Sequence, residues 1–360
     1  MRRTLPRRRV IVMLAALWAV GASFAAPAFG QGLFTVHPAG PGTSLKVGVL
    51  AQPTIDWPSA GSGADPGVYL RRFRVLTSAD LGRIKVFAET DSPMLGVHPG
   101  RVVTHEVFVQ DLAVTFAASP SLQIDGGRLL VPLAYNTVQS AASLLAVGYG
   151  PYSFLASGPT GSKVGRDWGL QARGALAGAV EYRVGVFEGA RRRDAGLPYR
   201  YAGRVQWYLA GLETGLFHTG TTIGRTRIVT VGAGFDHQAD YTATALDVFV
   251  DQPLPSGDAI TAQADYIHYD GGATLAALPR QDTMLLEAGY YVRPLRTTFF
   301  SQFAGDRVAG ARPDQGAIRA GAAVWLRGHR LNVKIGLGRV ARQRATPSTE
   351  VLIQTQWFVF

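Results

Sequence analysis

Basic side chains recur at alternate positions along several short segments of the chain, always on the polar side of the segment. Arginine keeps its charge at any working pH and donates a planar fork of N–H groups that fits phosphate and carboxylate oxygens. Such residues along a narrow space with low-dielectric walls would attract anions. The residues predicted to line this space are Arg72, Arg74, Lys85, Arg173, Arg183, Arg204, Arg319, Arg327 and Lys334.

Carboxylates fall on the same side of these segments, which leaves a second interpretation open. Charges of opposite sign on neighbouring strands pair with one another and stiffen the wall instead of attracting solutes. The two sets are nearly equal in size, so they do not produce a strong field of one sign. The acidic residues on this side are Glu89, Asp111, Asp125, Asp167, Glu181, Asp247, Asp265 and Glu287.

Segments of about ten residues that alternate between apolar and polar side chains make up most of the chain. In residues 166–174 (RDWGLQARG), Trp168 and Leu170 lie on one side and Gln171 and Arg173 on the other. A period of two predicts strands. The chain offers no second type of element to cover the apolar faces, so an apolar exterior makes sense only in lipid. We therefore predict an all-β fold, a transmembrane antiparallel β-barrel of about 16 strands with a water-filled lumen.

The last stretch, residues 349–360 (TEVLIQTQWFVF), sets the closure of this barrel. Ile353 and Trp357 lie on one side of it, and Gln354 and Gln356 on the other. An open strand edge in lipid costs several kcal/mol for each unpaired backbone group, so this strand must pair with the first one. A terminal phenylalanine is typical of the signal that the barrel-assembly machinery reads. The last strand of a soluble β-sandwich has the same pattern.

The first 30 residues predict a cleaved export signal. A basic stretch precedes an apolar run at residues 10–24, and small residues precede a cut before Gln31, with a cut after Ala28 as the alternative. The remaining residues, 31–360, show no linker and form a single barrel domain. They contain no apolar run of 18 residues, which excludes helical membrane spans. The chain has no cysteine, so no disulfide supports it.

Turn residues separate the predicted strands, and short turns alternate with long loops. Residues 211–222 (GLETGLFHTGTT) also resemble a strand, but an even strand number requires them to be a periplasmic connection. The predicted strands are residues 44–56, 68–79, 83–91, 105–117, 121–133, 166–175, 178–189, 199–209, 225–236, 241–251, 259–269, 283–292, 296–305, 316–327, 330–340 and 349–360.

The longest connection, residues 134–165, is rich in apolar and small residues (AASLLAVGYG, PYSFLASG). Long loops of this kind are usually functional or disordered. We predict that it folds into the barrel and constricts the pore, where Arg72, Arg74 and Arg173 face it. A loop on the outer rim, packed against a neighbour, is the other interpretation.

Enzyme signatures are weak. The 7 histidines are scattered without metal-ligand spacing, there is no Gly-x-Ser-x-Gly elbow, and no cofactor or metal is expected. The alternative to a channel is a closed or catalytic, hydrolase-type barrel plugged by residues 134–165. A hydrolase of this kind could place Ser and His on adjacent strands. His268 and Ser301 are the candidate pair, although they are not on neighbouring predicted strands. The run Arg191–Arg193 either contacts lipopolysaccharide phosphates or is a solvated loop tip. Nucleic acid is excluded by the predicted location.

Five segments, in order, resemble the phosphate-selective porin O and P family from about residue 44 to residue 360. They are residues 69–76 (YLRRFRVL), 165–171 (GRDWGLQ), 182–189 (YRVGVFEG), 225–238 (RTRIVTVGAGFDHQ) and 245–263 (ALDVFVDQPLPSGDAITAQ). The resemblance implies an outer-membrane porin, usually a homotrimer, that passes small anionic or neutral solutes by diffusion. Leu130 stands where the family often carries a basic residue, so the expected preference for anions such as phosphate is mild.

Overall fold

The computed structural model describes residues 33–37, 42–58, 66–93, 95–97, 106–153, 165–192, 194–310 and 313–360. The predicted export signal lies outside these residues. Among the described helices, none is long and apolar enough to cross a membrane.

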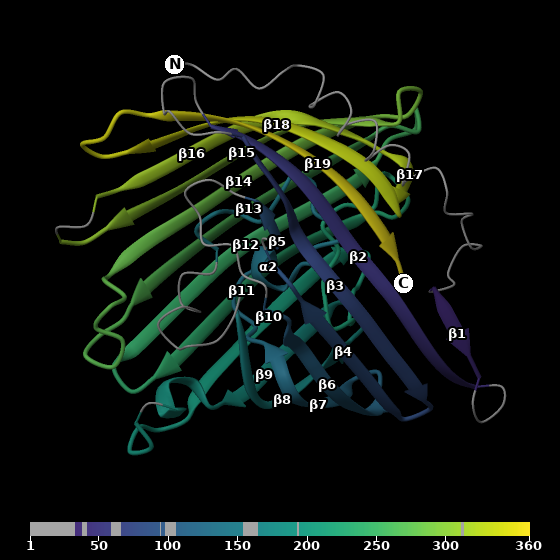
Figure 1. Cartoon of the computed structure of the whole chain (residues 1–360). Coiled ribbons are helices and arrows are strands. Elements are labelled where there is room, and N and C mark those ends of the chain that lie inside the picture. Colours follow the sequence, from purple (N-terminus) through teal and green to yellow (C-terminus); the bar gives the residue numbers. More distant parts are fainter. Residues whose placement is uncertain are drawn as a thin grey trace.

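Antiparallel strands that follow one another around a ring account for most of the described chain (Figure 1). The strands are β1 (Phe34–Val36), β2 (Thr43–Pro58), β3 (Gly67–Leu81), β4 (Ile84–Asp91), β5 (Leu95–Val97), β6 (Phe108–Ser119), β7 (Leu122–Leu130), β8 (Arg166–Leu176), β9 (Val180–Phe187), β10 (Arg200–Ala210), β11 (Ile228–Gln238), β12 (Tyr241–Pro253), β13 (Ala259–Asp270), β14 (Gln281–Val292), β15 (Thr297–Val308), β16 (Gln315–Val324), β17 (Leu326–His329), β18 (Leu331–Arg342) and β19 (Ser348–Val359). Within the described residues, two short helices interrupt them: α2 (Tyr135–Val138) and the 3-10 helix η1 (Gly189–Arg192).

The ring closes because β19 pairs with β2. Val359 lies opposite Val49, and Glu350 lies opposite Pro58. In the described residues, 16 strands form the closed antiparallel barrel, which confirms the predicted fold class and the pairing of last strand with first. β1 continues the line of β19 along the edge of β2, and β5 continues β4 after a break.

Residues 211–222 form no strand and lie in the connection from β10 to β11, as predicted from the even strand number. The observed strands match the predicted ranges to within a few residues, and two of them end early. The predicted strand 316–327 ends at Val324, and Arg327 lies beyond it in β17. The predicted strand 121–133 ends at Leu130, where the chain leaves the wall.

The two ends of the barrel differ in the length of the connections between strands. We call the end that holds the start of β2 and the end of β19 the terminal end, and the opposite one the loop end. Most terminal-end connections are tight, as between β8 and β9, where Ala177 and Gly178 both adopt positive φ (50° and 68°). Two successive residues in this conformation form the type I′ turn, whose twist matches that of paired strands. The longer connections gather at the loop end, as predicted.

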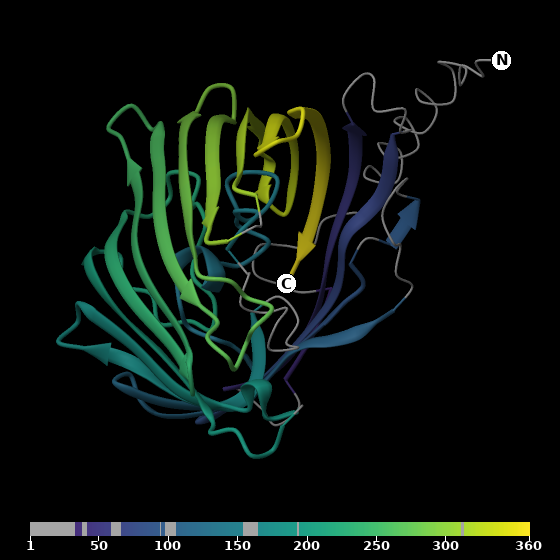
Figure 2. The same ribbon diagram turned by 90° about the vertical axis from the view of Figure 1, so that its left-hand side faces the viewer.

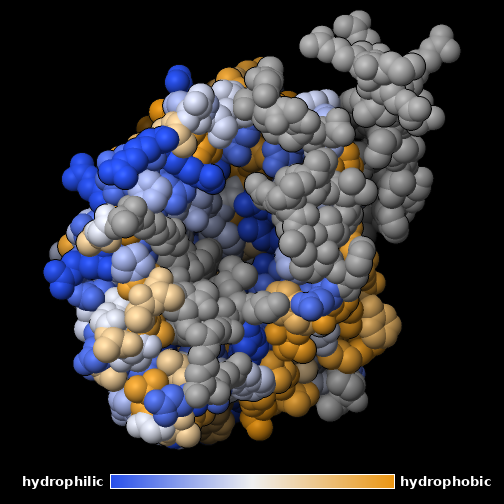
Figure 3. Space-filling model, turned by 60° about the vertical axis from the view of Figure 1, so that its left-hand side comes forward, coloured by the Kyte–Doolittle hydropathy of each residue, from blue (hydrophilic) through white to orange (hydrophobic). Residues whose placement is uncertain are grey.

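Side chains alternate between the outside and the inside of the wall, because successive residues of a strand point to opposite faces. On the outside, Leu170 and Leu246 are each 63% exposed, whereas on the inside Gln206 and Asn332 are 0% exposed. Figure 3 shows hydrophilic residues in the hollow of the barrel and hydrophobic residues on its outer wall. An apolar outer band around a polar interior is the pattern of a membrane-spanning barrel.

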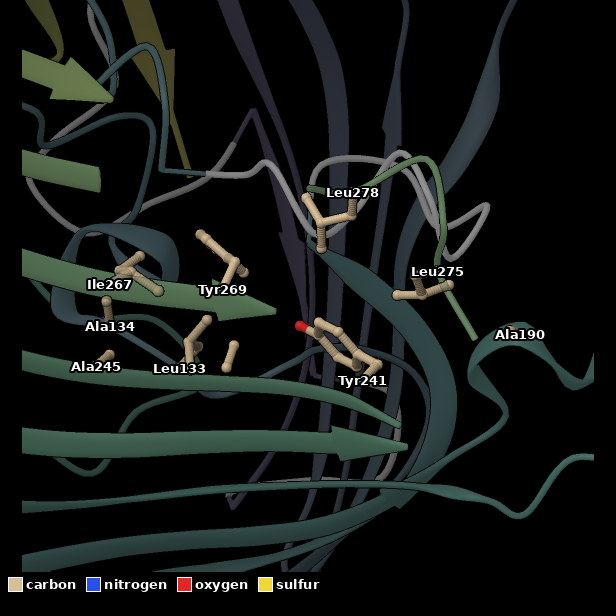
Figure 4. Packing of buried hydrophobic residues seen from close by; sticks show 10 residues of the cluster. Leu133, Ala134, Ala190, Tyr241, Ala245, Ile267, Tyr269, Leu275 and Leu278 are labelled. Atoms are coloured by element: carbon tan, nitrogen blue, oxygen red, sulfur yellow. The ribbon is translucent and has the colours of Figure 1, made fainter. Parts of the chain in front are cut away.

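The inner face is not polar throughout. Tyr241, Ala245, Ile267 and Tyr269 of β12 and β13 point inward and form a buried cluster with Leu133 (Figure 4). Here the inner face is apolar, because a segment of the chain packs against it from inside.

Candidate functional site: the barrel lumen

Residues 134–153 cross the interior of the barrel. They begin with α2 against β12 and β13, reach the opposite wall near β18 and β2, and return to β14 and β15. Almost all of them are buried, and Tyr135 and Val138 are fully inaccessible. Figures 1 and 2 both draw α2 inside the ring of strands. The remaining part of the predicted constriction loop, except residue 165, lies outside the described residues.

Polar side chains of the inner wall donate hydrogen bonds to the backbone carbonyls of this segment. Lys334 Nζ, only 1% exposed, donates to the carbonyl oxygens of Leu144 and Ala146 (3.0 Å for Ala146). Three glutamines do the same: Gln52 Nε2 to Ala141 O (3.3 Å), Gln356 Nε2 to Ala142 O (2.9 Å) and Gln302 Nε2 to Gly148 O (3.2 Å). A buried carbonyl without such a partner is costly, so these donors fix the path of the segment.

Wall carboxylates accept hydrogen bonds from the start of the same segment. Asp247 Oδ2 accepts from the backbone N–H of Tyr135 (3.1 Å), and Asp265 Oδ1 accepts from the N–H of Asn136 (2.9 Å). These N–H groups have no partner inside the single turn of α2. The wall charges therefore hold the first turn of the segment in place.

Residues 211–227, the connection from β10 to β11, enter the barrel from the terminal end and meet the first segment. His218 forms a parallel bridge with Gln139, and the N–H of Thr221 donates to Ser143 O (2.9 Å). A side chain at Gly220 would bring its Cβ within 2.4 Å of Ser143 O, so this contact requires glycine. Sequence reasoning identified the connection but missed its inward path. Residues 211–222 alternate like a strand, yet the even strand number excludes them from the wall. This combination was the signal in the sequence for an inward path.

Three of the predicted lumen arginines donate hydrogen bonds to the connection 211–227 or to the residue just before the first segment. Arg173 donates to the carbonyl of Thr214 and pairs with Asp125 (2.7 Å). Arg183 Nη2 donates to Gly215 O (2.8 Å) and pairs with Glu181 of its own strand (2.6 Å). Arg204 follows the same pattern, as it donates to Leu133 O (3.2 Å) and pairs with Asp247 (3.0 Å). Their charges are balanced by carboxylates, and each of them also donates to at least one backbone carbonyl.

Arg72 and Arg74 occupy the opposite wall. Arg74 pairs with Glu89 (2.8 Å) and Asp91 (3.1 Å) of β4. Arg72 Nη1 donates to Gln52 Oε1 (2.7 Å), and its guanidinium carbon lies 5.3 Å from the centroid of the Tyr149 ring.

Arg71 also reaches the interior, which strict alternation did not predict. Its Nη2 lies 2.3 Å from the position that a Cβ would take at Gly148. The register between β2 and β3 shifts between the Ala51 and Pro53 pairings, opposite Arg71 and Arg72. A bulge of this kind turns two successive side chains to one face.

The other predicted residues lie near the barrel ends or pair differently. Arg319 pairs with Glu350 (2.7 Å) and donates to Gln302 Oε1 (3.1 Å). Lys85 is 51% exposed and pairs with Asp80 (3.0 Å) at the terminal end, so it lies at the rim and not along the inner wall. Arg327 is exposed in β17. Arg166, which the sequence did not single out, is buried inside and pairs with Asp111 (3.0 Å).

The residue pair that a hydrolase would use does not come together. His268 of β13 lies on the outer face beside Asp282 (2.8 Å), and Ser301 of β15 also points outward. β14 separates their strands. Among the described residues, no group of His, Cys, Asp and Glu is arranged to hold a metal ion.

Lys334 offers a direct test of how the wall holds residues 134–153. Changing Lys334 to Met leaves the carbonyls of Leu144 and Ala146 without a donor, at a cost of about 1–3 kcal/mol for each buried group. We expect a larger current noise in the open channel and faster proteolysis of the segment. Arg319→Met removes the same charge but no hydrogen bond to the segment, so it is the matched control. Equal noise in the two variants would show that Lys334 does not fix the segment.

Comparison with known proteins shows which solved structures share this fold. No family model and no curated protein matches the chain. Among solved structures, it is similar to the anion-selective porin from Comamonas acidovorans, at 12% identity and a TM-score of 0.60, over 88% of this chain and 99% of that one. It is equally similar to Salmonella typhi OmpF in complex with daunomycin (12%, TM-score 0.60, 90% and 100%). OmpT, an outer membrane protein of Vibrio cholerae, follows with 10% identity, a TM-score of 0.57, and 89% and 99% coverage.

The chain therefore has the fold of the bacterial outer-membrane porins. The narrower likeness, to the phosphate-selective O and P porins, rests on the sequence segments alone.

Proposed function

We propose that this protein is a porin of a bacterial outer membrane that lets small hydrophilic solutes diffuse through a water-filled channel, without enzymatic activity. The observation that carries the proposal is the closed barrel with an apolar exterior and an inner wall of polar and charged side chains, two faces that suit lipid outside and water inside. The catalytic alternative is not favoured, because its candidate residues point away from the interior. Planar-bilayer recording tests the proposal, as described in the Discussion.

The inward segment of residues 134–153 supports a constriction inside this channel. In this proposal, residues 134–165 narrow the pore, and the basic residues near them set its selectivity. Arg72, Arg74 and Arg319 are the best placed of the predicted pore-lining residues, because no hydrogen bond described above ties them to backbone carbonyls. Arg173, Arg183, Arg204 and Lys334 act as supports of the inward segments.

The proposal includes a cellular setting. Residues 1–30 direct export, and the barrel-assembly machinery inserts the chain next to outer-membrane lipid and lipopolysaccharide. A homotrimer is the proposed assembly, in line with the trimer form named for the similar V. cholerae OmpT. Membership of the phosphate-selective O and P family belongs to this proposal, and its support is the order of the five sequence segments.

The preference for anions is mild in this account, since wall carboxylates balance most of the wall arginines. Replacing Arg72 and Arg74 by Ala leaves Glu89 and Asp91 without their partner and makes the local charge negative. We expect the anion-to-cation permeability ratio to fall, most clearly at low salt, where the Debye length is longest. Reversal potentials in a KCl gradient measure it. Arg344→Ala, in the exposed turn between β18 and β19, is the control; an unchanged ratio in the double variant would mean a pore without local selectivity.

A further inference from the structure

A groove opens on the outer face of the barrel, near the loop end of β8 and β9. It has a volume of about 680 Å³ and is lined by these two strands and by the connection from β9 to β10. This volume lies within the range of about 300–1,000 Å³ that is typical of sites for small molecules. The side chains that matter for its chemistry are Trp168, Leu170, Val186, Glu188, Arg191 and Tyr199.

The wall of the groove is apolar and aromatic. Leu170 lies opposite Val186 in the β8–β9 ladder, and Val186 lies opposite Tyr201 in the β9–β10 ladder, so three outward side chains form a row. Trp168 and Tyr199 are exposed and continue this row toward the loop end. Tryptophan and tyrosine concentrate where a bilayer meets water. The groove therefore runs from the apolar outer band of the barrel to the boundary between lipid and water.

Arg191 of η1 adds a positive charge to the groove at this boundary. Its guanidinium carbon lies 4.4 Å from the centroid of the Tyr199 ring, and Nη1 donates to Leu197 O. In the part of the chain that the structure describes, no carboxylate forms an ion pair with Arg191. Arginine has five N–H donors, so most of its fork is left for an anion.

The fold holds the backbone around Arg191 in a fixed position. Ala190 and Leu197, on either side of it in the sequence, pack against the buried cluster on the inner side of the wall. The Gln238 side chain of β11, which is 0% exposed, accepts from the N–H of Ala190 (2.9 Å) and donates to Pro198 O (2.8 Å). The connection from β9 to β10 is thus fastened near both of its ends, which presents Arg191 to the groove and not to open solvent.

We propose that this groove binds a phosphorylated glycolipid of the outer leaflet, the lipid part of lipopolysaccharide. One acyl chain lies along Leu170 and Val186, and a phosphate lies on the Arg191 guanidinium. Phosphate oxygens accept the paired N–H groups of arginine, and an acyl chain matches the apolar row. This inference rests on the proposed outer-membrane location, with the loop end outside the cell, and adds a defined lipid partner to it.

Native mass spectrometry of the purified barrel in detergent tests the site by titration with two lipids. The first is lipid A, which carries phosphates and several acyl chains, and the second has the same acyl chains without phosphate. We expect the wild type to bind the phosphorylated lipid about tenfold more tightly, because arginine and phosphate form charge-assisted hydrogen bonds. Equal binding of the two lipids would overturn the inference.

The groove side chains should separate the phosphate from the acyl chains. Arg191→Ala should lower the affinity for lipid A about tenfold and leave that for the other lipid unchanged, and Arg191→Lys should retain part of it. Arg344→Ala, in the exposed turn between β18 and β19, is the matched control and binds like the wild type. Glu188→Gln should strengthen the binding of lipid A, because it removes the one carboxylate among the residues that line the groove.

The apolar row has its own test. Leu170→Ser should weaken the binding of both lipids to the same extent, whereas Leu337→Ser, on the outer face of β18, should weaken neither. Lipid A binding that Arg191→Ala leaves unchanged would overturn the inference. KCl currents from the same samples separate it from the proposed channel: current without phosphate-dependent binding overturns the groove alone, and phosphate-dependent binding without current confirms the groove and overturns the channel.

Discussion

Replacing residues 140–148 by a short Gly/Ser linker is expected to raise the single-channel conductance by a factor of about two or more, because the segment crosses the interior and, in the proposed channel, narrows the pore. A short linker is sufficient, since the remaining ends already touch: Tyr149 Oη donates to Gln139 O (2.7 Å). Asn136 Oδ1 also accepts from the N–H of Gly150 (3.0 Å) and from Ser153 Oγ (2.7 Å).

The barrel itself survives this change, since the wall strands keep their pairing and the variant still runs as a heat-modifiable band in gel electrophoresis. A linker of equal length in the exposed turn 343–347 between β18 and β19 is the control for insertion effects. Conductance equal to that of the wild type would mean that solutes do not pass beside residues 140–148.

The second large effect concerns barrel assembly. We expect the chain to remain unassembled when Trp357 and Phe360 are changed to Asp, or when Phe360 is deleted. Trp357 lies on the outer face between Leu331 of β18 and Ala51 of β2, at the closing seam. A carboxylate there must be desolvated in the lipid, as in other barrels where charges on the lipid face destabilise. Phe360 packs inside, where a Cβ at Gly48 would lie 2.7 Å from its ring.

Assembly is read from heat modifiability and from protease resistance of membrane fractions. Thr349→Asp places a carboxylate on the same strand at its exposed loop end and should assemble normally. A normal heat-modifiable barrel from the Trp357 and Phe360 variant would refute the role of the last strand as the closing element.

The wall of the barrel was predictable because its determinants are local. Alternation along ten residues, turn residues between segments and the requirement to close an edge in lipid give the strands, their number and the pairing of β19 with β2. The alternation of short turns and long loops, with an even strand number, also excludes residues 211–222 from the wall. Each of these rests on a period or a parity that a single sequence contains.

The interior was less predictable because its determinants are long-range. Residues 211–227 turn inward to meet residues more than 70 positions away, as in the hydrogen bond from Gly220 N–H to Ser143 Oγ (2.8 Å). The inward position of Arg71 depends on a one-residue bulge, which no period reveals. The lumen arginines looked like anion sites because alternation gives the face of a side chain but not its partner.

One signal in the sequence does point to the interior. On β12, Ala243, Ala245 and Phe249 occupy the inner face beside Asp247 and Asp251, so this inner face is partly apolar. In a barrel, a strand of this kind indicates that chain, and not water, covers it from inside. The same reading applies to Phe87 of β4, whose inner neighbours include the inward connection.

Single-channel recording of the purified, heat-modifiable protein in a planar bilayer tests the central claim most directly. The account predicts discrete current steps in KCl that are ohmic at low voltage and grow with salt concentration, as expected for diffusion through a water-filled pore. Folded protein that inserts into the bilayer but gives no steps at any salt concentration would contradict it, and the barrel would then be closed by the segments in its lumen.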